Sequence, residues 1–311
     1  MENRTLQGID TLGKEDVATF RDRGYLVVDR MLPPAFVAAL RTRFAPLFRG
    51  EFDTGTYPDE WYWRDGMSLP DVTRHMGNAW KSDLTVAALV LSSAIARTAA
   101  RLAGWDGIRL GQDTLWWKPP QTKAIALHQD TSFTDFLDPA ETITCWVTLD
   151  DTRADAGTIE YVPGSHRWPL VGRPLDFHTP EGGYRAKMLA AARQAGIVDP
   201  QPVPLEVPAG TAVFHHGHIW HGSGPNTTTG LERRSIGIHM LPAHTRFGKA
   251  GGSYIYGRYQ RVGDDRMDED FFPILWTAAG GRTAWLDGYV ETGQRGQAAT
   301  APDAKPIAAA Y

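Results

Sequence analysis

The chain has 311 residues, of which 42% are hydrophobic and 22% charged, the composition of an ordinary globular protein. Its 32 basic and 36 acidic residues leave a formal net charge of −4 without any run of Lys or Arg. This balance argues against a nucleic-acid or anionic-lipid partner. Because Cys145 is the only cysteine, an intramolecular disulfide and a cysteine-based zinc or iron–sulfur site are excluded.

Helices are predicted to dominate residues 1–105. The apolar spacing predicts two helices on either side of a short strand, and each helix ends close to a glycine. Two prolines suit the first turn of the second helix, since the backbone there needs no N–H donor. The predicted elements are a helix over 14–23, a strand over 25–31 and a helix over 33–48.

A third helix is predicted after an irregular region over 51–80. Ser82 or Asp83 can cap it, and we expect it to continue through Leu102. Its most apolar stretch, 86–104, is interrupted by two serines and two arginines, so we expect a buried or amphipathic helix and no bilayer span. The polar N-terminus lacks an apolar signal core, and we expect a cytoplasmic protein.

From residue 106 the pattern changes to strands. Short runs rich in Val, Ile, Thr and aromatic residues alternate with Gly, Pro and Asp turns, and a helical insertion is expected near 183–195. Helices followed by about eight strands favour a mainly β, α+β protein. Its core would be a double-stranded β-helix (jelly roll, cupin-like) with an N-terminal helical layer. The strand candidates are 108–118, 124–128, 142–149, 158–162, 211–216 and 234–241.

These elements predict a single domain over 1–311. The N-terminal helical region 1–105 precedes a β core over 106–245 and a C-terminal extension over 246–292. The last residues, 293–311, contain few large apolar side chains and are expected to form a loose tail.

Two segments carry side chains that can bind a metal. Residues two apart on an extended chain point to the same side, so His128 and Asp130 can reach one point. Alone, this motif is common by chance. Residues 215–221 hold four of the ten histidines, and one of them would complete the two-His, one-carboxylate set of non-haem iron(II) oxygenases. The alternative is a polar loop with histidines in the core.

Arg233 and Arg234 follow the histidine cluster on a predicted strand. A guanidinium can bind a carboxylate through two parallel hydrogen bonds, as the far carboxylate of 2-oxoglutarate requires. A lone arginine on a strand is more often a surface charge, so the sequence leaves both interpretations open.

In this order and at these separations the segments resemble the phytanoyl-CoA dioxygenase family of Fe(II)- and 2-oxoglutarate-dependent oxygenases. The resemblance extends from Phe20 to Pro242, and Trp146 lies eighteen residues after His128, at the family's spacing. Further matching residues are Gly157, Val162-Pro-Gly-Ser-His166 and His221-Gly-Ser-Gly-Pro-Asn226.

The resemblance implies the ligands of the metal. Iron would be held by His128, Asp130 and His221, because the family's distal motif begins at His221. Gln129 would lie beside the iron as a candidate substrate contact. The alternatives to His221 are His215, His216 and His218, for which supporting roles suit the pattern better.

The resemblance also implies the cosubstrate contacts. Arg233 would anchor 2-oxoglutarate, with Arg234 as the alternative because the spacing from the distal histidine is one residue longer than in some relatives. Ser223 and Trp146 would contact the cosubstrate, as would Thr114.

The implied activity is hydroxylation of an aliphatic carbon of a small molecule, with Fe(II) as cofactor and 2-oxoglutarate and O₂ as cosubstrates. Desaturation, epoxidation and rearrangement use the same ligands and stay open. Asp130 argues against halogenation, because the family's halogenases have Ala or Gly there. A zinc hydrolase or a non-catalytic jelly-roll module would leave Arg233 and Ser223 without a role. Candidate pocket aromatics are Trp61, Trp63, Trp116, Trp117, Phe133 and Phe136.

Overall fold

The computed structural model describes residues 6–172, 176–178, 180, 182–248 and 255–293. The predicted tail therefore lies outside the described residues, apart from Gly293. The described helices are α1 Lys14–Arg23, α2 Pro34–Phe48, α3 Leu84–Val90, α4 Ser93–Ala103, α5 Ala186–Gln194 and α6 Leu286–Thr292, with 3₁₀ turns η2 Ala79–Lys81, η3 Asp130–Phe133, η4 Ser165–Arg167 and η5 Gly257–Tyr259. The strands are β1 Tyr25–Val28, β2 Glu60–Trp61, β3 Arg74–Gly77, β4 Gly107–Lys118, β5 Ile125–His128, β6 Leu137–Asp138, β7 Ile143–Thr148, β8 Ile159–Tyr161, β9 Val203–Pro204, β10 Ala212–His216, β11 His221–Ser223, β12 Arg233–Pro242, β13 Arg246–Phe247 and β14 Ile274–Thr277.

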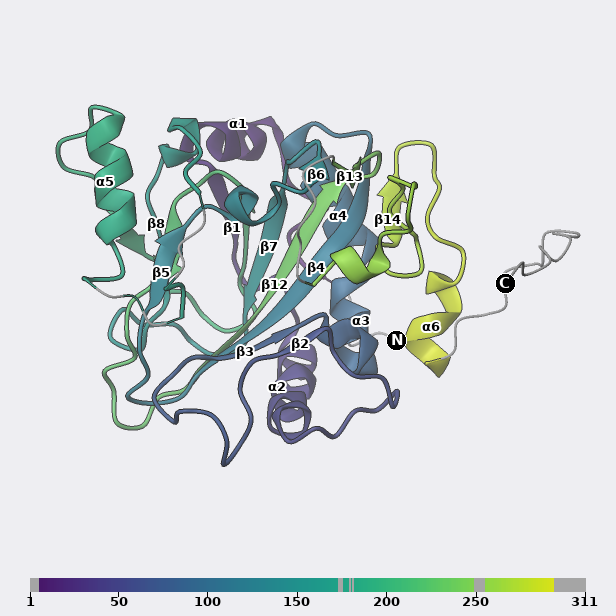
Figure 1. The fold of residues 1–311 in the computed structure, drawn as a ribbon, viewed down its shortest axis with the longest axis horizontal. Coiled ribbons are helices and arrows are strands. Elements are labelled where there is room, and N and C mark those ends of the chain that lie inside the picture. The colour runs from purple at the N-terminus through teal and green to yellow at the C-terminus, as the bar shows by residue number, and fades with distance from the viewer. Residues whose placement is uncertain (1–5, 173–175, 179, 181, 249–254, 294–311) are drawn as a thin grey trace, which may run out of the picture.

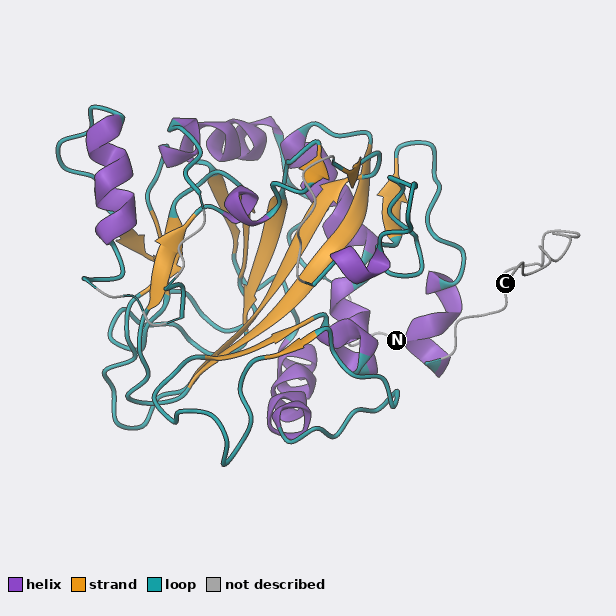
Figure 2. Ribbon diagram, in the orientation of Figure 1, coloured by secondary structure: helices purple, strands orange, loops and turns teal. Residues whose placement is uncertain are grey.

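Two sheets form the double-stranded β-helix that the sequence predicts (Figure 1). The large sheet has the order β1-β10-β7-β12-β4-β3-β2, with β14 also paired to β4, and the small sheet has the order β5-β11-β8-β9. Figure 2 shows the large sheet in the middle of the molecule, with α5 beyond the small sheet on one side and α3, α4 and α6 towards the other. The fold class is confirmed.

The two faces of the large sheet have different partners because side chains alternate along a strand. On β7, Ile143, Cys145 and Val147 pack into the main hydrophobic core with the N-terminal helices. Thr144 and Trp146 point to the opposite face, where they line a cavity between the sheets. The helical layer thus buries one face of the sheet and leaves the other available for a site.

A β-bulge in β4 changes which of its residues face the cavity. Gln112 pairs with His239 and Leu110 pairs with Met240, so Gly111 is an extra residue in β4. Leu110 and Met240 therefore lie in the hydrophobic core, whereas Gln112 and His239 line a cavity. Such a bulge re-aims side chains beside a functional site.

The N-terminal elements agree with the sequence apart from the third helix. The strand and the two helices that were predicted before residue 50 are present as β1, α1 and α2. The predicted helix through Leu102 is wrong as a single element, because the chain turns at Leu91 and Ser92 between α3 and α4. Asp83 caps α3 and Ser92 caps α4, each by accepting a hydrogen bond from a backbone N–H three residues on.

The apolar segment 84–103 has the length and composition of a candidate membrane span, but 61% of its most apolar window is buried inside the protein. It packs through α3 against α2 and α6, and through α4 against β4, β7 and β14. Burial against these elements explains its apolar character.

The six predicted strands are confirmed. The six candidate runs correspond to β4, β5, β7, β8, β10 and β12 within two residues at each end. The helical insertion is α5. The prediction of an irregular region over 51–80 is wrong in part, because β2 and β3 extend the large sheet there.

Candidate active site

His128 and His221 face each other across the small sheet. They are direct partners in the antiparallel pairing of β5 with β11, and their ring centroids are 4.2 Å apart. Each ring Nδ1 lies 3.0 Å from the carbonyl oxygen two residues earlier, that of Ala126 or Ile219. Since a carbonyl oxygen only accepts, each Nδ1 carries the proton and each Nε2 presents a lone pair to the space between the rings.

Asp130 completes this arrangement at the start of η3. Its Oδ1 lies 3.4 Å from Nε2 of His128 and 3.4 Å from Nε2 of His221. Its Oδ2 accepts hydrogen bonds from Thr144 at 2.6 Å and from His215 Nε2 at 3.1 Å. Burial alone would raise the pKa of Asp130, but the neighbouring histidines hold it well below its usual value, so the group is a carboxylate.

The three side chains fit a divalent metal ion. Their donor atoms, one from each of His128, Asp130 and His221, all lie within 4.8 Å of one another, and all three residues are buried. Burial and the nearby His221 lower the pKa of His128, so its imidazole is in the neutral form that binds metals. Two imidazoles and one carboxylate match the donor set of non-haem iron(II).

The other histidines of the cluster lie elsewhere. His215 holds Asp130 Oδ2 through Nε2 and accepts a hydrogen bond at its Nδ1 from Tyr161, 2.8 Å away. His216 ends β10 and His218 lies on the turn that follows it; both are half-buried, and the backbone N–H of His218 donates to Nδ1 of His216. The geometry thus places His221, and none of its alternatives, beside His128.

Gln129 does not face the substrate, so that expectation is wrong. The residue is 1% exposed, and its side-chain amide bonds the backbone of His218 and Val171. It therefore ties the metal segment to two neighbouring loops and is a structural residue.

A small cavity connects the three donor atoms with Arg233. Its lining also includes Ser223 from β11, Trp146 from β7 and Gly237 from β12, and it is bounded by His215 and His239. Arg233, Ser223 and Trp146, predicted as cosubstrate contacts, therefore line one space next to the metal site.

Arg233 is a buried cation with neutral partners. It is 4% exposed and donates to the Gly157 carbonyl at 3.2 Å and to Ser235 Oγ at 2.7 Å. Burial lowers its pKa to about 10, so it is still protonated at neutral pH. In the described part of the chain, no carboxylate forms an ion pair with it.

Arg234 points the other way, as the next residue on a strand must. It forms ion pairs with Asp150, at 3.0 Å, and with Glu232, so its charge is already compensated. A buried charge without a counterion is unfavourable. The geometry therefore favours Arg233 over Arg234 as the residue that binds a carboxylate from outside the chain.

A large cavity opens on the other side of the metal site. It shares His128, Asp130, His239 and Trp116 with the small cavity. Thr114 lines this large cavity and not the small one, so its contact with the cosubstrate stays a prediction.

Three of the six candidate aromatics line the large cavity: Trp116, Phe133 and Phe136. The other three do not. Trp117 follows Trp116 on the strand and packs on the opposite face against Phe44 and Phe48. The guanidinium of Arg74 lies over the ring of Trp63, and Trp61 packs against Phe52.

Several wall residues of the large cavity were not anticipated. Phe177 lies near the α5 insertion, and Ile255, Tyr256, Met267 and Phe272 belong to the C-terminal extension. These five residues belong to no short motif, so no local sequence pattern identifies them as wall residues of the cavity.

The comparisons with known proteins agree with this site. Residues 20–235 match the family model described as phytanoyl-CoA dioxygenase (PhyH). A probable alpha-ketoglutarate-dependent hypophosphite dioxygenase of Stutzerimonas stutzeri is 30% identical over 139 residues, 44% of this chain and 46% of that protein. The peroxisomal phytanoyl-CoA dioxygenase of Rattus norvegicus is 35% identical over 127 residues, 39% of this chain and 36% of that enzyme. The matched region thus spans less than half the length of these curated relatives.

Solved structures share the fold over most of the chain. The non-heme alpha ketoglutarate dependent carbocyclase SnoK from nogalamycin biosynthesis aligns with a TM-score of 0.65 and 25% identity, over 86% of this chain and 98% of that one. The epimerase SnoN in complex with Fe³⁺, alpha ketoglutarate and nogalamycin RO aligns with a TM-score of 0.63 and 22% identity, over 85% and 98%. Because the family model covers more than half of the sequence, the chain belongs to the phytanoyl-CoA dioxygenase family of iron- and 2-oxoglutarate-dependent oxygenases.

Proposed function

We propose that this protein hydroxylates an aliphatic carbon of a small, largely apolar molecule, with iron held by His128, Asp130 and His221. The observation that carries the proposal is the convergence of two Nε2 lone pairs and one carboxylate oxygen in a buried space between two cavities. Iron and 2-oxoglutarate, when bound, would supply the oxidation of the substrate by O₂.

The residues of the small cavity would hold the cosubstrate. Arg233 lines the same cavity as the metal ligands and has two neutral partners and a positive charge. It would bind the far carboxylate of 2-oxoglutarate through two hydrogen bonds. Ser223 would add a hydroxyl donor, and Trp146 would form an apolar wall that excludes water.

The large cavity would take the substrate. Aromatic and aliphatic side chains make up about half of its described lining residues, and no lysine or arginine occurs among them. Burial lowers the pKa values of His75 and His178 in this wall to about 3, so both imidazoles are neutral. An apolar wall without cations favours a natural-product-like or lipid-like molecule over the phosphate-rich part of an acyl-CoA.

The reaction type follows from Asp130 and the substrate's position. Asp130 would occupy the ligand position that a halide needs, so we expect no chlorinated product. Desaturation or rearrangement on the same site is the alternative, as solved structures with this fold include a carbocyclase and an epimerase.

Three experiments test the proposal. Anaerobic addition of Fe(II) and 2-oxoglutarate should produce a weak visible charge-transfer band that requires both components, which a zinc hydrolase or a binding module would not give. A screen of apolar small molecules for stimulated succinate formation would then identify a substrate. Mass spectrometry after reaction under ¹⁸O₂ should find label in the product alcohol, whereas turnover that consumes no 2-oxoglutarate would contradict the proposal.

A further inference from the structure

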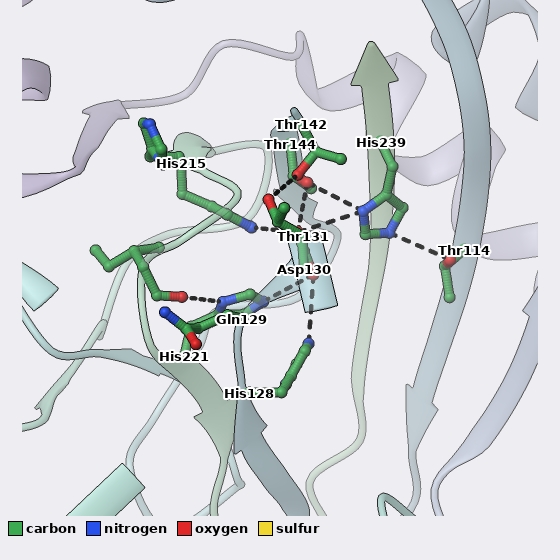
Figure 3. Close-up of polar contacts among 12 residues, drawn as sticks. Thr114, His128, Gln129, Asp130, Thr131, Thr142, Thr144, His215, His221 and His239 are labelled. Atoms are coloured by element: carbon green, nitrogen blue, oxygen red, sulfur yellow. Dashed lines mark hydrogen bonds and ion pairs between the residues drawn. The ribbon is translucent and has the colours of Figure 1, made fainter. Parts of the chain in front are cut away.

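The hydrogen bonds of Asp130 continue past the metal site into the wall of the large cavity (Figure 3). Thr144 Oγ lies 2.6 Å from Asp130 Oδ2 and 3.0 Å from Nδ1 of His239. Nε2 of His239 lies 3.4 Å from Thr114 Oγ, which in turn lies 3.0 Å from Nε2 of Gln112. We call the side chains of Thr144, His239, Thr114 and Gln112 the β-sheet chain. It runs from the Asp130 carboxylate to Gln112, which lines the large cavity.

The direction of the first links follows from counting protons. The Asp130 carboxylate only accepts, so the single hydroxyl proton of Thr144 points to Asp130. The oxygen of Thr144 must then accept the proton of His239, which places the imidazole N–H on Nδ1. His239 Nδ1 is also 3.4 Å from Asp130 Oδ2, and this contact requires the same tautomer.

The remaining links point the same way. In a neutral imidazole with its proton on Nδ1, Nε2 is an acceptor, and the Thr114 hydroxyl is the group that faces it. The oxygen of Thr114 accepts from the side-chain amide of Gln112. Every member therefore donates towards Asp130, and donors aligned in this way strengthen one another.

Strand register builds this chain. His239 on β12 pairs with Thr144 on β7 and with Gln112 on β4, so the three residues lie side by side across the large sheet. Gly237, two residues before His239 on the same face, lies beneath the histidine ring, and a Cβ there would come within 3.3 Å of Nε2. Gln112 lies on the same face of β4 as Thr114, two residues on, and the β-bulge at Gly111 turns Leu110 to the opposite face.

We propose that the β-sheet chain positions Asp130 as a one-oxygen metal ligand and couples that ligand to the substrate cavity, an inference that rests on the proposed function. Holding Oδ2 leaves Oδ1 alone directed at His128 and His221. Gln112 would exchange hydrogen bonds with a neutral polar group of the substrate, and this would alter the donors that reach Asp130. Thr144 and His239 are positioning residues, since both act through Asp130.

Metal affinity of the complete protein without cosubstrate tests the proposal, with Mn(II) as the probe in isothermal titration calorimetry. Thr144→Val removes the donor to Oδ2 and should raise the Kd for Mn(II) about tenfold or more, because partners of ligating carboxylates typically contribute 10–100-fold. The matched control is Thr148→Val, on the same face of β7. The hydroxyl of Thr148 donates to the backbone carbonyl of Asp150, which is not part of the β-sheet chain. It should leave the Kd unchanged.

His239 supplies a rescue test and a spectroscopic one. His239→Leu should raise the Kd for Mn(II) about threefold or more, whereas His239→Asn, whose amide can replace the Nδ1 donor, should restore most of the affinity. The charge-transfer band of the Fe(II)–oxoglutarate complex should shift in Thr144→Val and not in Thr148→Val.

The outcomes separate the inference from the proposed function. If wild-type protein binds Mn(II) and His239→Leu binds it equally tightly, the positioning role is wrong while the proposed function stands. A wild type that binds no Mn(II) overturns both. Should Thr144→Val fail to fold, the comparison of His239→Leu with His239→Asn decides the question, because an equal loss in both would assign His239 a packing role only.

Discussion

At the scale of single residues, Asp130 uses its two carboxylate oxygens differently. Oδ1 faces the two imidazoles, and Oδ2 is held by Thr144 and His215. His215 can donate only because Tyr161, whose pKa burial raises well above 10, donates to its other nitrogen. The orientation of the ligand is thus fixed by buried groups that do not contact the metal.

Removing any one ligand should abolish turnover. His128→Ala, Asp130→Ala and His221→Ala each delete one of three donors, so we expect loss of bound iron and of oxoglutarate consumption. His218→Ala is the matched control, since that histidine lies half-buried on the turn before β11. Iron content and succinate formation check the prediction. Full activity in His221→Ala, together with loss in His218→Ala, would transfer the ligand role.

Arg233 should determine the affinity for 2-oxoglutarate. Hydrogen bonds to a charged group contribute about 1.5–3 kcal/mol, so Arg233→Ala should raise the apparent KM for oxoglutarate by about one to two orders of magnitude. Arg234→Ala removes a neighbouring arginine that is already paired with Asp150 and Glu232, and it should leave this KM within about twofold. Steady-state kinetics at varied oxoglutarate decide between them, and the reverse pattern would assign the anchor to Arg234.

At the scale of elements, the pairing of β5 with β11 brings the two metal histidines together. The strands contact so closely at Gly222 that a Cβ there would lie 2.9 Å from the Cα of Leu127 and 3.0 Å from the Ala126 carbonyl oxygen. Both are backbone atoms of β5, the strand that carries His128. The glycine between His221 and Ser223 therefore sets the separation of the two ligand strands.

Gly222→Ala should push β11 away from β5. We expect a loss of about 1–3 kcal/mol of stability from overpacking, together with weaker metal binding, because His221 moves relative to His128. Gly230→Ala is the control, since a Cβ there meets nothing within 4 Å. Denaturant unfolding and Mn(II) titration check both effects. Metal affinity equal to that of Gly230→Ala would show that the strand spacing does not control the site.

The elements that the sequence predicts well are those with many residues of one pattern. β4 and β12 are long and rich in apolar residues, and both appear where periodicity places them. β11 consists of His-Gly-Ser and has no apolar or β-branched side chain, so no strand pattern marks it although it carries a metal ligand. The break between α3 and α4 was missed because apolar spacing continues through Leu91, and only the Ser92 cap marks a new helix.

The candidate site follows the same rule. Residues within short motifs, such as His128 and Asp130, could be assigned because their spacing on an extended chain has a geometric consequence. The roles of Thr144 and His239 could not, because a threonine and a histidine 95 positions apart meet only through strand register. The β-bulge at Gly111 also reverses the facing of β4, so that the core positions change from Ile108 and Leu110 before it to Leu115 and Trp117 after it.

At the scale of the whole molecule, the metal site lies where the two sheets meet. The donors belong to the small sheet and η3, and the partners of Asp130 belong to β7, β10 and β12 of the large sheet. The C-terminal extension closes the large cavity and also pairs β14 with β4. A ligand at this point therefore lies between the two sheets and the C-terminal extension.

Metal and cosubstrate should accordingly stabilise the protein in a fixed order. A ligand at one hundred times its Kd adds about 2.7 kcal/mol to the free energy of unfolding, which corresponds to about 4 °C in Tm for a chain of this length. We expect Mn(II) to give such a rise in the wild type, a chelator to reverse it, and His221→Ala to abolish it.

Oxoglutarate should add a second rise only when metal is present, because it binds partly through the metal. In Arg233→Ala the first rise should remain and the second should shrink, since the metal ligands are intact and the carboxylate anchor is gone. Thermal denaturation of the three proteins with metal, oxoglutarate or both measures this. A rise with oxoglutarate alone would place its main binding determinant outside the metal site.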